Sequence, residues 1–242
     1  MTLRVMTYNI QHGHVHLSDH IDLTKTADVI RECGAEIIGL NEVRGLGKKY
    51  ADYTAQVEQM AAYLGYHCYF GRSIYVRGTE PYGNAVLSKY PIVEASVIRI
   101  PDPVEPEARR KTESRTLCRC VVEVPDGDTV RPVAVYASHF GLSKIEQEHA
   151  VSTAETTLRD EQLPAVLMGD FNVTPDDPVL APLNALLNGT DELLEGEFSF
   201  PSDKPRIKID YIYTTKNITP VRAEIVSVIA SDHCPIWADL EL

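Results

Sequence analysis

Apolar and polar positions alternate with two different periods in the first 65 residues, and they predict two strand–helix units. Residues 3–10 and residues 36–44 are apolar runs rich in β-forming residues, so both predict strands. Residues 22–33 and 53–64 repeat apolar side chains at helical spacing and each stops before a glycine, which predicts two amphipathic helices. Both predicted strands end in polar groups.

The middle of the chain has the hydrophobic pattern of short β-strands. Turns that contain proline or glycine separate five short runs, so we expect strands at 67–70, 83–88, 93–100, 116–124 and 130–138. Residues 101–115 hold three prolines and a mixed cluster of charges, which predicts a long surface loop. Loops of that length inside a compact domain tend to be functional or mobile.

The last hundred residues return to a mixed pattern. Helical spacing predicts helices at 144–161 and 179–187, and apolar runs predict strands at 166–168, 207–213, 221–228 and 236–240. No repeat of fixed period, low-complexity tract or flexible linker interrupts the chain. The order of elements predicts one α/β (α+β) domain over residues 1–242, with helices outside two packed, mixed and mostly antiparallel sheets.

Composition narrows the range of partners. The net charge of −12 argues against tight non-specific binding of polyanions, because affinity for a phosphate backbone comes from lysine and arginine. A nucleic-acid substrate is therefore disfavoured but not excluded. The one obvious basic cluster for such a contact is Arg109, Arg110 and Lys111 in the predicted loop.

The chain also lacks sequence signals for export. It shows no charged leader with an apolar core, and its apolar runs fall far short of the roughly 20 residues that a membrane-spanning helix needs. The five cysteines are odd in number and scattered, and none matches a zinc-ribbon spacing. We therefore expect reduced thiols, no membrane span and a cytoplasmic location.

The stretch Gly169-Asp170-Phe171-Asn172 is the strongest candidate for chemistry. It follows an apolar run, and on an extended backbone Asp170 and Asn172 face one side while Phe171 faces the core. A carboxylate beside an amide suits a site that handles an oxyanion and a hard cation. The alternative is that the two polar residues cap a loop.

Other predicted strands stop in the same way. Each polar stop alone has a structural explanation, but six strand ends carry only Asn, Glu, His or Asp: Asn9, Glu42, His139, Asp170 with Asn172, Asp210, and Asp232 with His233.

These motifs in this order resemble the endonuclease/exonuclease/phosphatase superfamily, which is the DNase I-like group, and the likeness runs from residue 3 to residue 240. The matching segments are Thr7–Ile10, Leu40–Val43, Gly83–Ser88, Ser138–His139, Gly169–Asn172, Ile209–Ile212 and Ser231–His233. The segment 198–210 is similar to the small bacterial metal-dependent hydrolases of that group. The resemblance implies a four-layer sandwich and hydrolysis of a phosphoester with Mg²⁺ or Mn²⁺.

The resemblance also implies roles for the polar residues. Three residues are assigned to the metal: Glu42, which matches the principal metal carboxylate, Asn9, which lies beside it, and Asp232, which matches a carboxylate on the metal or nucleophile side. Five residues match the catalytic positions: His233 with its carboxylate partner Asp210, Asp170 and Asn172 around the attacking water, and His139 as a second donor to the phosphate. Whether Asp170 or His233 is the general base stays open.

Two arginines are candidates for phosphate contact, whereas three histidines near the N-terminus are not assigned to the site. Arg115 and Arg44 match phosphate-contacting arginines, although for Arg44 a surface position on a glycine-rich loop is the alternative. Asn41 departs from the glutamine usual in the family and is expected to leave the metal in place. His12, His14 and His16 alternate on a loop without cysteine or glutamate partners, so we expect them to be exposed to solvent.

The leading hypothesis is a metal-dependent phosphodiesterase in which an activated water attacks phosphorus. A nuclease acting on DNA or RNA is the first alternative, and a catalytically dead binding protein of the same fold is the second. Every polar position that the mechanism needs is filled, which argues against the dead site. The natural substrate, the choice between monoester and diester, the number of metals and the oligomeric state stay open.

Overall fold

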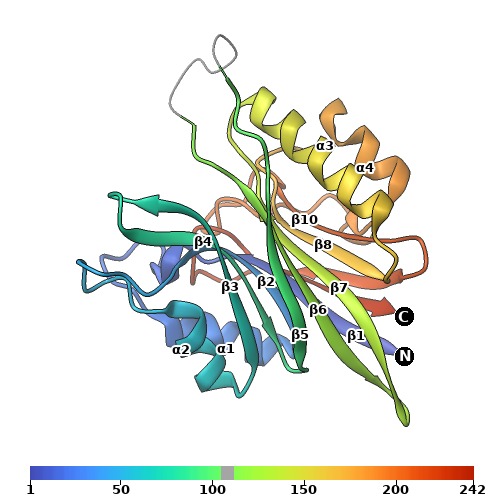
Figure 1. The fold of residues 1–242 in the computed structure, drawn as a ribbon, viewed down its shortest axis with the longest axis horizontal. Helices are drawn as coiled ribbons and strands as arrows, with labels where there is room; N and C mark the ends of the chain where they lie inside the picture. The colour runs from blue at the N-terminus through green and yellow to red at the C-terminus, as the bar shows by residue number, and fades with distance from the viewer. Residues whose placement is uncertain (105–111) are drawn as a thin grey trace.

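The computed structural model describes residues 1–104 and 112–242 and shows two six-stranded sheets packed face to face (Figure 1). The first sheet has the order β11 (Thr219–Ile225), β12 (Ile236–Glu241), β1 (Thr2–Asn9), β2 (Ile37–Arg44), β4 (Glu80–Ser88), β3 (His67–Val76). The second has the order β5 (Ile92–Arg99), β6 (Thr116–Asp126), β7 (Thr129–His139), β8 (Ala165–Asp170), β10 (Asp210–Thr214), β9 (Asn188–Gly189). Within each sheet one pair is parallel, β1 with β2 and β7 with β8, and the other pairs are antiparallel.

Four α-helices in the described part of the chain flank the sheets. Figure 1 shows α1 (Leu23–Cys33) and α2 (Gln56–Leu64) beside the first sheet, and α3 (Lys144–Asp160) and α4 (Ala181–Leu186) beside the second. Local sequence defines their ends: the Asp22 side chain accepts the backbone N–H groups of Thr24 and Lys25, and Ser143 and Glu146 form a capping box at α3. The predicted four-layer sandwich is confirmed.

Three apolar clusters hold these layers together. One lies between the sheets and includes Val5, Val135 and Met168, while the other two pack α1 and α2 on the first sheet and α3 and α4 on the second. The side chains that point away from the shared core are thus also buried, which explains why the central strands read as continuous apolar runs. No helix in the described residues has the length and hydrophobicity to cross a bilayer.

Several element boundaries differ from the sequence prediction. Strand β3 continues to Val76 rather than ending at Phe70, because β4 begins at Glu80 and pairs along its whole length. Strand β10 begins at Asp210, and Ile207 joins only an isolated bridge with Phe200. The helix predicted at 179–187 is a 3₁₀ turn at Pro178–Leu180 followed by α4. The five cysteines are free thiols.

Candidate active site

A cavity of about 660 Å³ opens where polar ends of both sheets meet. Eight of the ten residues that the sequence singled out line it: Glu42, Arg44, Arg115, His139, Asp170, Asn172, Asp232 and His233. The other two, Asn9 and Asp210, are 1% exposed and contact lining residues from behind. The structure therefore gathers all ten at one site, although they come from distant parts of the chain.

Strand register places the residues at the centre of the site. In the second sheet, Asp170 at the end of β8 lies beside His139 at the end of β7 and opposite Asp210 at the start of β10. Gly169 makes the close approach of β8 to β7 possible, because its φ is +153° and a Cβ there would overlap the carbonyl oxygen of Ser138. The glycine before Asp170 is thus required by the backbone packing of β8 against β7, whereas the aspartate is required by the chemistry of the site.

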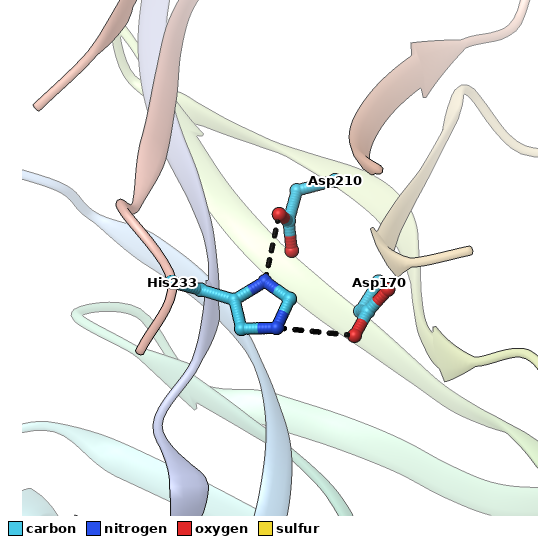
Figure 2. A group of neighbouring side chains, drawn as sticks. All are labelled: Asp170, Asp210 and His233. Carbon is cyan, nitrogen blue, oxygen red and sulfur yellow. Dashed lines mark hydrogen bonds and ion pairs between the residues drawn. The ribbon is translucent and has the colours of Figure 1, made fainter. Parts of the chain in front are cut away.

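A histidine lies between two buried carboxylates (Figure 2). His233 Nδ1 is 2.9 Å from Asp210 Oδ2, and Nε2 is 3.6 Å from Asp170 Oδ2. Ser199 Oγ donates to the same Asp210 oxygen at 2.6 Å. Because Asp210 holds Nδ1, the Nε2 side of the imidazole is directed to Asp170 and the cavity.

Asp170 is held by donors from both sheets. Its Oδ1 accepts the Asn172 N–H at 2.9 Å, and its Oδ2 accepts Asn9 Nδ2 at 3.0 Å. His139 Nε2 lies 3.4 Å from that second oxygen. The backbone N–H of Asp170 donates to Asn41 Oδ1 at 2.9 Å, so a side chain of the first sheet fixes a strand end of the second.

Burial and charge move the pKa values of these groups in different directions. Burial alone would lower the pKa of His233, but the Asp210 and Asp170 carboxylates outweigh it and raise the value to about 10. Burial raises the pKa of Asp170 to about 7, with His233 opposing and Asp210 adding to the effect. Burial, Arg115 and His233 lower the pKa of His139. At neutral pH the site therefore holds a protonated His233 and a neutral His139.

Glu42 lies at a distorted point of β2. Its φ is 60°, and the register with β4 shifts between Leu40 and Val43, which is the signature of a β-bulge. Glu42 Oε2 accepts the Tyr82 hydroxyl at 2.8 Å, and Oε1 accepts Asn9 Nδ2 at 3.2 Å. A non-glycine residue in this conformation stores strain, as is common at functional sites.

Asn9, which the resemblance groups with the metal residues, makes hydrogen bonds to two acidic side chains. Its Nδ2 donates to Glu42 and to Asp170, and its Oδ1 accepts the N–H of Gln11 at 3.1 Å. An amide nitrogen between two carboxylates is a donor, so Asn9 links the two acids and its oxygen is turned away from Glu42. Asp232, the third residue of that group, lines the cavity, and its Oδ1 accepts Ser231 Oγ at 3.1 Å.

Two arrangements could hold a metal ion. Glu42 offers a hard oxygen donor at the cavity wall. Asp170, Asp210 and His233 form a second group, whose potential ligand atoms lie within 4.8 Å of one another. In that group Asp210 Oδ1 is buried without a hydrogen-bond partner among the described residues. An unpaired buried carboxylate oxygen of this kind is costly unless a proton or a cation compensates it.

Asn172 reaches the cavity in a way that the extended-backbone argument did not predict. Its φ is 52°, its Nδ2 donates to Phe140 O at 3.1 Å, and its carbonyl accepts Gln147 Nε2 at 2.8 Å. Phe171 does face the core, where its ring stacks on Phe140 with centroids 4.0 Å apart. A left-handed turn after β8 thus replaces the alternation expected at Asp170–Asn172.

Both predicted phosphate-binding arginines line the cavity. The Arg115 side chain is 14% exposed, and its Nη2 lies 3.5 Å from Glu113 Oε2. The Arg44 side chain is 15% exposed, so the alternative of a surface arginine is wrong. The basic cluster Arg109, Arg110 and Lys111, suggested for nucleic-acid contact, lies outside the described residues.

Sequence reasoning missed two residues of the site. Tyr82 binds Glu42, and His12 lines the cavity. The prediction that His12, His14 and His16 are solvent-exposed is wrong, since all three are half-buried; His14 contacts Gln11 and His16 pairs with Asp203. The position of His12 three residues after the polar end of β1 was the signal available for it.

Comparison with known proteins places the chain in a family. The model of the Endonuclease/Exonuclease/phosphatase family matches residues 6–233. The uncharacterized protein YbhP of Escherichia coli (strain K12) is 24% identical over 261 residues, a match that covers 100% of this chain and 97% of YbhP.

Solved structures agree in fold. The endonuclease/exonuclease/phosphatase from Beutenbergia cavernae DSM 12333 superposes with a TM-score of 0.82 at 25% identity, covering 100% of this chain and 72% of that one. The mannosyl-6-phosphatase Bt3783 of Bacteroides thetaiotaomicron VPI-5482 gives a TM-score of 0.75 at 17% identity, covering 99% and 100%. The chain belongs to the Endonuclease/Exonuclease/phosphatase family.

Proposed function

We propose that the protein is a divalent-metal-dependent phosphoester hydrolase in which a water molecule attacks phosphorus. The observation that carries this proposal is the buried row Asp210–His233–Asp170 at the floor of a cavity whose wall holds Glu42. Family membership supports it, since members are hydrolases that act on phosphoesters. A dead binding protein has no need for two carboxylates and a histidine buried together, because their desolvation is costly.

The donor set fits a hard cation such as Mg²⁺ or Mn²⁺. Glu42 supplies oxygen, Tyr82 and Asn9 hold its two oxygens in place, and Asp232 brings a second carboxylate to the same cavity. Mg²⁺ is often bound through only one or two protein carboxylates, with water and phosphate oxygens completing its shell. When bound at Glu42, the metal would neutralise charge on the phosphoryl oxygens and ease departure of the leaving oxygen.

The protein groups divide the proton chemistry between them. His233 is protonated at neutral pH, so it acts as a donor to a phosphoryl oxygen rather than as a base, and Asp210 keeps its Nε2 aimed at the cavity. Asp170, with a pKa near neutrality, is matched to accept the proton of the attacking water. As the water oxygen bonds to phosphorus, its proton passes to Asp170 and the leaving oxygen departs with the electrons of the broken P–O bond.

The charges of the cavity favour a diester. Around the reacting phosphate, Arg115 and the protonated His233 face four acidic side chains on the cavity wall, which are Glu42, Glu113, Asp170 and Asp232. A phosphodiester carries one negative charge where a monoester carries up to two, so the diester is repelled less before a metal binds. We therefore propose phosphodiesterase activity ahead of phosphatase or nuclease activity.

The test is a panel of phosphomonoesters, small phosphodiesters, RNA and DNA, assayed with Mg²⁺, with Mn²⁺ and with EDTA. We expect small diesters to be hydrolysed with either metal and not with EDTA. Asp170→Asn should lower kcat by about 10²–10⁴-fold, which is the usual effect of losing a general base. The exposed residue Asp128, in the turn between β6 and β7, gives the matched control Asp128→Asn.

Three outcomes would contradict parts of the proposal. Turnover that persists in EDTA would exclude the metal, and full activity of Asp170→Asn would exclude its role as base. Faster hydrolysis of RNA or DNA than of every small diester would replace the phosphodiesterase with the nuclease.

A further inference from the structure

One side of the cavity contains polar groups that the proposed hydrolysis leaves without a role. These are Arg44 at the end of β2 and His12 in the loop after β1, and with Tyr53 they form what we call the Arg44 subsite. The Arg44 guanidinium stacks on the Tyr53 ring, with its Cζ 4.9 Å from the ring centroid. Such stacking holds a planar guanidinium in one orientation.

The Arg44 charge is only partly compensated. Its Nη1 lies 2.9 Å from Asp52 Oδ2, but the two are not aligned for a hydrogen bond, and the Asp52 side chain is 46% exposed. Within residues 1–104 and 112–242, Nη1 and Nε of Arg44 are buried and have no hydrogen-bond acceptor. Buried donors are nearly always satisfied, so a guanidinium that lacks these acceptors and pairs with an exposed carboxylate favours an acidic group on its cavity side.

A buried amide holds this subsite in place. Gln56, at the start of α2, is 1% exposed; its Oε1 accepts the Arg44 N–H at 2.9 Å and its Nε2 donates to the His12 carbonyl at 2.7 Å. One side chain therefore fixes the backbone of both cavity residues. A subsite whose backbone is tied in this way is preorganised, which lowers the entropic cost of binding.

His12 completes the subsite as a neutral group. Burial and the charge of Arg44 lower the pKa of His12 to about 4. Its Nδ1 is buried with no partner in the described part of the chain, and its ring lies 6.3 Å from that of Tyr82. His12 thus adds a neutral imidazole beside Arg44 without a second charge.

The Arg44 subsite is distinct from the group of residues around the reacting phosphate. The charges that act on the pKa of His139 are those of Arg115 and His233, whereas those that act on the pKa of His12 come from Arg44, His14 and Asp52. Tyr82 and Glu42 join the two regions through their hydrogen bond. Arg115 is therefore the arginine next to the catalytic histidines, and Arg44 is available for another part of the substrate.

Building on the proposed function, we infer that Arg44 and His12 bind a second acidic group of the substrate, so that the preferred substrate is a small phosphodiester with one arm ending in a carboxylate or phosphate. The cavity of about 660 Å³ falls in the range of small-molecule sites, which is 300–1,000 Å³. The exposed Asp52 is the competitor that such a group must displace from Arg44.

Three matched esters test this inference with one leaving group: propyl, 2-carboxyethyl and 2-phosphonoethyl p-nitrophenyl phosphate. With Mg²⁺ present, we expect kcat/KM for the acidic arms to exceed that of the propyl ester by about tenfold or more, because a hydrogen bond to a charged group is worth that much. Arg44→Gln should reduce this ratio to near 1. Asp52→Asn should raise it several-fold, since the competing carboxylate is gone.

The matched control is Arg72→Gln. Arg72 also stacks on a tyrosine, with its Cζ 4.0 Å from the Tyr75 ring centroid, but it is exposed and does not line the cavity. This variant should keep the wild-type ratio. Equal kcat/KM for the three esters in the wild type, or an equal loss for all three in Arg44→Gln, would overturn the inference.

A binding measurement separates this inference from the proposed hydrolysis. Calorimetric titration with 2-carboxyethylphosphonate and with propylphosphonate, neither of which is hydrolysed, should show tighter binding of the first to the wild type and equal binding to Arg44→Gln. If the wild type prefers 2-carboxyethylphosphonate but hydrolyses none of the esters, the proposed hydrolase function is refuted and the Arg44 subsite is supported. No preference would refute the subsite, whatever the turnover.

Discussion

At the scale of single residues, the site depends on opposite demands placed on two neighbouring groups. Asp170 is buried deeply enough to hold a proton near neutral pH, while His233 is charged because two carboxylates lie beside it. The same contact of 3.6 Å between them opposes the first shift and promotes the second. In the proposed mechanism the pair supplies a base and an acid in the same pH range.

This pair predicts a bell-shaped pH profile. Activity needs Asp170 without its proton and His233 with its proton, so kcat/KM should rise with pH through about 7 and fall as pH passes about 10. His233→Gln should abolish the fall on the alkaline side as well as lower the rate. The measurement is kcat/KM on a small diester from pH 5 to pH 11, with free Mg²⁺ held at one concentration that stays below the solubility of its hydroxide at the highest pH, and with Asp128→Asn as the control.

A different profile would assign the roles differently. If activity rose with a midpoint near 6.5 and that rise vanished in His233→Gln, His233 would be the base. Asp170 would then only accept hydrogen bonds from its neighbours and orient them.

The sequence could predict which residues gather at the site but not how each one is held. Polar residues at the ends of apolar strands identify His139 and Asp170, because the pattern indicates where a strand leaves the core. The bulge at Glu42 and the left-handed turn at Asn172 are local backbone choices that depend on neighbouring strands. His12 was missed because the loop that carries it is folded against the cavity by a contact with Gln56, which is distant in sequence.

At the scale of elements, the pairing of β7, β8 and β10 sets the relative positions of three side chains of the site. His139, Asp170 and Asp210 are adjacent because parallel pairing on one side of β8 and antiparallel pairing on the other bring three strand ends to one row. The apolar pattern of each strand was visible in the sequence. The order of strands in each sheet was not predicted, because pairing between distant strands leaves no local signal.

Gly169→Ala tests the closeness of β7 and β8. A Cβ at this position overlaps the Ser138 carbonyl and requires a backbone conformation that alanine avoids, so we expect a loss of about 2–4 kcal/mol in the free energy of unfolding. Urea denaturation followed by far-ultraviolet circular dichroism measures the loss. Gly127→Ala, at a turn with positive φ and open space around it, is the control and should cost less. An equal loss in both variants would show that backbone conformation alone, and not the overlap, sets the cost.

At the scale of the whole molecule, the site lies where the two sheets meet and takes residues from both. Glu42, Tyr82 and Arg44 come from the first sheet, and His139 and Asp170 come from the second. Asn41 crosses between them: its Nδ2 donates to Ser138 O at 2.9 Å and its Oδ1 accepts the Asp170 N–H at 2.9 Å. The shorter amide in place of the glutamine usual in the family therefore contacts Asp170 directly.

Asn41→Ala should lower both the stability and the activity of the protein. The substitution leaves buried backbone groups of Ser138 and Asp170 unpaired, at about 1–3 kcal/mol each, and frees the position of Asp170 relative to Glu42. We expect kcat to fall at least tenfold in protein that is still folded, measured well below a thermal midpoint determined by calorimetry. Asn217→Ala, on the exposed turn between β10 and β11, is the control. Wild-type kcat in folded Asn41→Ala would show that the sheets hold their register without this amide.

The left-handed backbone at Glu42 has an evolutionary consequence. Glycine and asparagine adopt that conformation more easily than glutamate, so a lineage released from selection for hydrolysis gains stability from the same substitution that removes the carboxylate. Catalysis lost through this substitution is not easily regained, because a return to glutamate would also bring back the backbone strain. A glycine or asparagine at this position in a relative of the same fold would therefore mark a descendant that has abandoned catalysis.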